Sequence, residues 1–232
     1  MVEEGLRAHR PMENIVTRRR LRIRIAVAIV LLGIAAVVMS PIRLQILRGA
    51  GHILIVNDPV QPADVIVVTV GAGGPGVLEA ADLVHAGVAP RVAVFGEPPD
   101  GMVETEFARR GVAYENAAQQ SIRYLRALSV DTVDLIPTTY VTGSEDETGM
   151  LADWCEQHGF HSVVVVSNSD HSRRIRRMLH RSMKGHQTKV ITCSSPYSGF
   201  DPDRWWQSRR GVRTEVVELQ KLLFDMLRHP IS

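Results

Sequence analysis

Beyond Gly49, short apolar segments alternate with longer segments in which apolar residues recur at helical spacing. The short segments are apolar on both faces, and they read "DVIVVTV", "RVAVFG", "TVDLIPTT", "SVVVVS" and "KVITC". Strands of this kind are buried on both sides, which is typical of a parallel sheet covered by helices. The alternation therefore predicts an α/β fold over residues 50–232, a three-layer Rossmann-like sandwich with a mostly parallel sheet of about five strands.

A continuous apolar run covers residues 25–39, and arginines crowd the residues before it. The run extends back to Leu21 if the flanking arginine side chains reach toward water, which is long enough for a short membrane-spanning helix. A cleaved signal peptide would have an apolar core of similar length, but no small-residue cleavage site follows Met39. A buried soluble helix would have a polar face, which this run lacks. We therefore expect a transmembrane helix over residues 21–40, preceded by a cytoplasmic basic tail over residues 1–20.

More arginines precede the apolar run than follow it, which places the residues beyond Gly49 outside the cytoplasm. The chain has 232 residues and a formal net charge of +2, so no overall positive field indicates nucleic acid as a partner. Its two cysteines, Cys155 and Cys193, are far apart, and buried free thiols are favoured over one disulfide. The residue spacing predicts no metal site, and it identifies no cofactor.

A basic turn, "SNSDHSRRIRRM", directly follows the fourth predicted strand. In parallel sheets, ligands bind where strands end and helices begin, because unpaired backbone N–H groups and positive helix ends lie there. His171, Arg173 and Arg174 fall in the first helical turn, where cations oppose the helix dipole, so we expect them to bind an anion together with Ser167. Three later arginines are expected to cover the solvated face of the same helix: Arg176, Arg177 and Arg181.

A glycine-rich loop, "GAGGPG", follows the first predicted strand. Glycine permits close approach of the backbone to a phosphate, so Gly71, Gly73 and Gly74 are expected to bind the ligand. The loop also satisfies the G-x-G-x-x-G pattern between a strand and a helix, and Glu97 follows the second strand where a ribose-binding acid would stand. An adenosyl ligand, such as S-adenosylmethionine or a nucleotide, is therefore an alternative to another phosphorylated ligand.

Six segments in order resemble those of the YdcF, SanA and ElyC family of bacterial envelope-associated proteins. They are "ADVIVVTVGAGGPG", "HAGVAPRV", "GSEDET", "SNSDHSRRI", "DPDRWW" and a final helix carrying Glu218, Lys221, Leu222 and Leu223. The resemblance covers roughly residues 63–227, and it extends to the membrane-anchored members of the family.

The resemblance implies a polar site formed by Glu104, Glu147, His171 and Arg174, each beyond the carboxyl end of a different strand. Glu104 or Glu147 would act as a base or metal ligand, and His171 as an acid or a phosphate contact. The implied protein is an envelope enzyme of the bacterial plasma membrane that acts on, or binds, a phosphorylated or lipid-linked envelope precursor. A non-catalytic scaffold for cell-wall synthesis is the alternative class.

Overall fold

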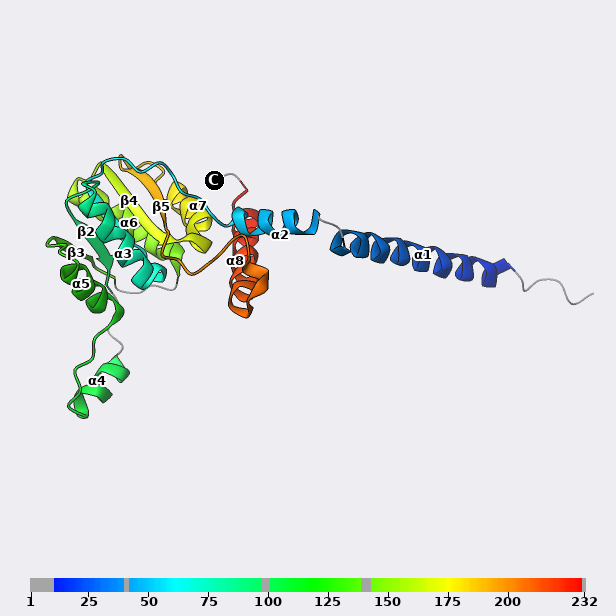
Figure 1. The fold of residues 1–232 in the computed structure, drawn as a ribbon, viewed down its shortest axis with the longest axis horizontal. Coiled ribbons are helices and arrows are strands. Elements are labelled where there is room, and N and C mark those ends of the chain that lie inside the picture. Colours follow the sequence, from blue (N-terminus) through cyan, green and yellow to red (C-terminus); the bar gives the residue numbers. More distant parts are fainter. Residues whose placement is uncertain (1–10, 40–41, 97–100, 139–142, 231–232) are drawn as a thin grey trace, which may run out of the picture. The chain divides into compact units, whose positions relative to one another are not determined.

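The computed structural model describes residues 11–39, 42–96, 101–138 and 143–230 (Figure 1). The chain divides into two compact units, Met1–Leu47 and Arg48–Ser232. In the first unit, α1 (Pro11–Met39) contains most of the segment predicted to span a membrane, and it begins earlier than predicted. Within the described residues, no helix combines the length and the apolar character that crossing a membrane requires. Helix α2 (Ile42–Ile53) leads into the second unit.

In the described part of the second unit, five parallel strands form one sheet in the order β3-β2-β1-β4-β5. The strands are β1 (Val65–Val68), β2 (Val92–Phe95), β3 (Val133–Ile136), β4 (Ser162–Asn168) and β5 (Lys189–Ser195). This confirms the predicted Rossmann-like α/β fold, with every described strand parallel. The order grows outward from β1 to β3, and then reverses at β4, which pairs with the other edge of β1. The neighbouring carboxyl ends of β1 and β4 therefore form the reversal point, where sheets of this kind commonly bind ligands.

In the described residues of the second unit, six helices follow the strands or close the chain (Figure 1). They are α3 (Gly73–His85), α4 (Gly101–Arg109), α5 (Ala117–Ala127), α6 (Ser144–His158), α7 (Ser172–Ser182) and α8 (Arg209–Arg228). Short 3-10 turns precede three of them, namely η1 (Val70–Ala72), η2 (Ser169–His171) and η3 (Trp205–Gln207). Local sequence explains several ends: Asn116 and Gln119 form a capping box at the start of α5, and Gly159 ends α6 in the left-handed conformation.

Two apolar cores cover the two faces of the sheet, because successive strand side chains point to opposite sides. Ile66 and Val68 pack in one core with residues of α3 and α5, while Val65 and Val67 pack in the other with residues of α6 and α7. Burial of each such side chain contributes about 1.5–3 kcal/mol, which explains why the strands are continuously apolar. Cys193 lies in the first core and Cys155 in the second, and both are free thiols, as the sequence favours.

Two of the three arginines of α7 predicted to cover a solvated face, Arg177 and Arg181, do not cover one, so the prediction is wrong for these two; the third, Arg176, is 40% exposed. Arg177 Nε and Arg181 Nη2 each lie 2.6 Å from an oxygen of Asp225 on α8, and their side chains are only 18% and 16% exposed. Arg176 pairs with Asp58 at 3.0 Å. The physical reason is that α8 turns Asp225 toward α7, and Arg177 and Arg181 are its counterions. The basic run that follows β4 therefore joins the sheet to the last helix.

Candidate functional site

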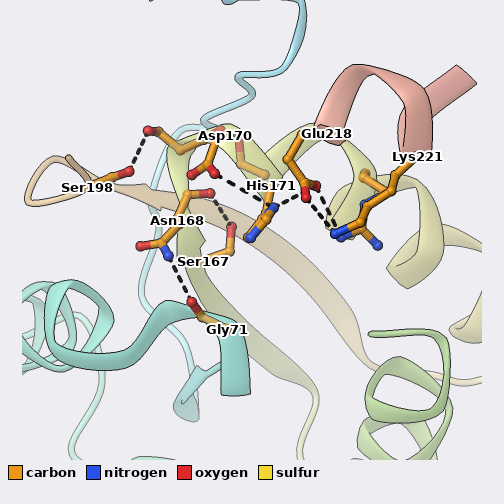
Figure 2. Close-up of polar contacts among 11 residues, drawn as sticks. Gly71, Ser167, Asn168, Asp170, His171, Ser198, Glu218 and Lys221 are labelled. Atoms are coloured by element: carbon orange, nitrogen blue, oxygen red, sulfur yellow. Dashed lines mark hydrogen bonds and ion pairs between the residues drawn. The ribbon is translucent and has the colours of Figure 1, made fainter. Parts of the chain in front are cut away.

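The loops at the carboxyl ends of β1 and β4 are tied together by Asn168. Its side-chain Nδ2 donates a hydrogen bond to the carbonyl oxygen of Gly71 at 2.8 Å (Figure 2). At the adjacent strand, the Ser195 hydroxyl donates to the carbonyl of Pro75 at 2.7 Å. Side chains at the ends of β4 and β5 thus hold the backbone of the glycine-rich loop in place. Asn168 was not among the residues predicted for the site, although it lies in the quoted turn.

Two glycines of the loop are required by the backbone, and one faces open space. Gly73 has a φ of +49°, which disfavours residues with a side chain. A β-carbon on Gly76 would lie 2.5 Å from the Ala72 β-carbon and 2.8 Å from Val68 Cγ1, so only glycine lets α3 begin this close to β1. No atom lies within 4 Å of a β-carbon placed on Gly74. The first turn of α3, whose N–H groups have no partner within the helix, is therefore accessible.

His171 lies between α8 and the glycine-rich loop (Figure 2). Its Nδ1 is 2.7 Å from Glu218 Oε2, and 3.9 Å from the carboxylate of its neighbour Asp170. A β-carbon placed on Gly71 would lie 3.8 Å from Cδ2 and 4.0 Å from Nε2 of the ring. One ring nitrogen is therefore fixed by a carboxylate, and the opposite edge of the ring faces the loop that follows β1. This is the arrangement in which an imidazole is oriented for proton transfer or anion contact.

Glu218 is the central charge of this cluster, although it is only 4% exposed. Besides His171, it pairs with Arg174 Nη2 at 3.3 Å and with Lys221 Nζ at 2.7 Å. Burial opposes its ionisation, but the close contact with His171, the hydrogen bond from Lys221 and the charge of Arg174 prevail and lower its pKa to about 2. The carboxylate is thus ionised over the whole physiological range. The sequence contained this residue in its final quoted motif, but nothing local to α8 indicated which face it occupies.

Glu147 joins the cluster from the start of α6. Its Oε2 accepts a hydrogen bond from the backbone N–H of Val70 at 3.4 Å, directly at the end of β1. Burial raises the pKa of Glu147, and the Val70 hydrogen bond and the charges of Arg174 and His171 offset that rise only in part. A carboxyl group that retains its proton to higher pH beside an oriented histidine is suited to acid–base chemistry.

Other predicted residues have different positions. Glu104 lies on α4, which has no buried residue, and among the described residues no hydrogen bond or ion pair connects it to the cluster. Arg173 donates to the carbonyls of Ile53 and Ile55, so it fastens the segment after α2 to the start of α7. Ser167 is fully buried, and its hydroxyl donates to the carbonyl of the next residue. Glu97, the expected ribose ligand, lies outside the described residues.

Two hollows flank the glycine-rich loop. The one beside β2 is lined by Thr69, Val70, Gly73, Gly74, Phe95, Ser121 and Tyr124, among others. The one beside β5 is more polar, and its lining includes Pro75, Asn168, Asp170, Ser198, Arg210 and Thr214. Arg210 adds a cation that sequence analysis did not select. Over the described residues, no group of three or more histidine, cysteine or acidic side chains is arranged to hold a metal ion.

The fold and the cluster define a Rossmann-like α/β protein with a polar side-chain cluster at the reversal point of its sheet, between two hollows that flank the glycine-rich loop. Comparison with known proteins found no matching family model and no matching curated protein. The relationship to the YdcF, SanA and ElyC family therefore stays a prediction that rests on the six quoted motifs.

Proposed function

We propose that the polar cluster at the carboxyl ends of β1 and β4 binds a phosphorylated ligand. The observation that carries this proposal is that His171, paired with Glu218, faces Gly71 in the glycine-rich segment that leads into the accessible first turn of α3. Helix N-termini attract anions through unpaired N–H groups and the helix dipole. Combined with the family resemblance, this favours a phosphorylated or lipid-linked precursor of the bacterial envelope as the ligand.

In this proposal, His171 contacts the phosphate or transfers a proton, and Glu147 is the second group able to exchange a proton. Glu218 is a positioning residue, because its carboxylate touches the ring of His171. Arg174 supports Glu218 through their ion pair, which replaces the direct anion contact expected from the sequence. Glu104 has no assigned part in this mechanism. A scaffold without catalysis would need none of these proton-exchanging groups.

An adenosyl ligand is the second candidate, and the hollow beside β2 favours it. This hollow is continuous with Gly73 and Gly74, and the aromatic side chains of Phe95 and Tyr124 contribute to its wall. In Rossmann-like folds, a phosphate at the helix N-terminus places the rest of a nucleotide at the neighbouring strand ends. A nucleotide would place its phosphate where the first candidate places its own, whereas S-adenosylmethionine has no phosphate. Binding measured with both kinds of ligand therefore separates the candidates.

The test uses the full chain in detergent, titrated in a calorimeter with inorganic pyrophosphate, with a nucleoside diphosphate and with S-adenosylmethionine. Binding of pyrophosphate that His171→Ala weakens by about 1.5–3 kcal/mol, tenfold or more, supports the phosphate site. The control is His180→Ala, an exposed position on the same helix. Equal binding by both variants contradicts the role of His171, and binding of S-adenosylmethionine alone favours the second candidate. Mass spectrometry of small molecules retained during purification would identify the natural ligand.

A further inference from the structure

Helix α8 exposes apolar side chains and buries its acidic ones, which is the reverse of an ordinary surface helix. Its buried residues are Glu215, Glu218, Leu222 and Asp225. The exposed apolar side chains include Val212, Val216, Leu223, Phe224, Met226 and Leu227. Leu227 is 82% exposed and Phe224 64%. We call these six residues the α8 apolar face. Contiguous exposed apolar residues of this kind mark a binding surface.

The charges on the exposed part of α8 have one sign. All of α8 is described, and its three acidic residues are buried while its basic residues are exposed: Arg209, Arg210, Arg213, Lys221 and Arg228. On a helical projection, Val212, Val216, Leu223 and Leu227 follow one another at spacings of about one or two turns. A surface that combines an apolar stripe with cations and no exposed anion is complementary to anionic lipid headgroups above a hydrocarbon layer.

A second copy of the chain fits this surface less well. A symmetric dimer through α8 would bring the same cations of two helices into one interface, and like charges oppose such pairing. We propose that the α8 apolar face docks on an anionic lipid bilayer. The proposal is independent of the ligand proposed for the polar cluster. It is tested by a readout at α8 itself, which does not depend on whether the N-terminal helix spans a membrane.

The experiment places an environment-sensitive nitrobenzoxadiazole label at Leu227→Cys in the full chain. The natural cysteines are 0% and 2% exposed, so the introduced thiol reacts selectively. The labelled protein is reconstituted with vesicles of phosphatidylcholine alone and with vesicles that also contain phosphatidylglycerol. We expect a blue shift of the emission and loss of acrylamide quenching only with phosphatidylglycerol. Added salt should reduce both effects, because it screens the headgroup charge.

Two control proteins complete the design. A label at Arg126→Cys, an exposed position on α5, should report water in both lipids. With the Leu227→Cys label, Arg209→Gln together with Arg213→Gln should remove most of the difference between the lipids, because two cations are lost. The proposal is overturned by quenching that is unchanged in every lipid, or by shielding that is equal in both. It is also overturned by shielding accompanied by energy transfer between labelled copies, which would identify a second copy of the chain as the occupant.

Discussion

Glu215 and Glu218 lie one turn apart on the buried face of α8, yet their carboxyl groups have opposite surroundings. Glu218 is in contact with His171, Arg174 and Lys221. Glu215 is 1% exposed, and neither of its oxygens has a hydrogen-bond partner within the described structure. Burial alone raises the pKa of Glu215, whereas the partners of Glu218 lower its pKa to about 2. Ionisation of Glu215 therefore destabilises the folded state, whereas ionisation of Glu218 stabilises it.

Glu218→Gln should lower the free energy of unfolding at neutral pH by about 3–5 kcal/mol, because it leaves the largely buried guanidinium of Arg174 without its counterion. The folded-state pKa of Glu218, about 2, lies below the ordinary glutamate value of 4.5, so its stabilisation is present above pH 4.5 and is lost as the pH falls toward 2. The variant should lose that part of the pH dependence. Urea denaturation at a series of pH values measures both effects.

Glu215→Gln is the matched control, since it changes an equally buried glutamate on the same helix face. It should leave stability at neutral pH unchanged or raise it, because an ionised carboxylate without partners is costly to bury. A larger loss for Glu215→Gln than for Glu218→Gln would contradict the assignment of Glu218 as the centre of the charge cluster.

At the scale of elements, the contact between α7 and α8 decides how much each arginine of α7 contributes to stability. Arg177→Ala should cost about 2–4 kcal/mol, since it removes a half-buried guanidinium that holds Asp225 at 2.6 Å and the His229 carbonyl at 2.7 Å. Arg176→Ala, on the same helix but 40% exposed, should cost about 0–1 kcal/mol. Thermal and urea unfolding of the two variants compare them. Similar, small losses would show that the pairing with α8 contributes little.

The strands could be predicted because a strand buried on both faces has a continuous run of apolar residues, as in "SVVVV" before the basic turn. The glycine-rich loop could be predicted from a similarly local pattern, since its strand, turn and helix are adjacent in the sequence. The function of the arginines could not be predicted in this way. Arg177 and its partner Asp225 are 48 residues apart, and only packing determines that α8 turns its acids inward.

Among the site residues, those placed by the strand ends could also be predicted, whereas those placed by long-range packing could not. Gly71 and His171 were predicted to converge because the carboxyl ends of parallel strands share one sheet edge, and the structure places them together. Glu218 was not predicted as a site residue, because it lies on a helix that follows the sheet and no local sequence pattern indicates which side chain it contacts. Glu104 was selected through the family resemblance alone, and its position on α4 provides no contact with the others.

At the scale of the whole molecule, the sequence predicts on which side of a membrane the second unit lies. Arginines crowd residues 7–24, whereas Arg43 and Arg48 are the basic residues just after the apolar run, and such asymmetry keeps the N-terminus in the cytoplasm. A bacterial alkaline phosphatase fused to the C-terminus should therefore be active, because it requires an oxidising compartment to fold. A fluorescent protein exported through the same route should stay dark. Replacing the arginines of residues 18–24 by glutamine should reduce phosphatase activity, since it removes the charge that fixes the orientation. Fluorescence together with an inactive phosphatase would place the second unit in the cytoplasm. It would then exclude an envelope precursor outside the membrane as the ligand of the polar cluster.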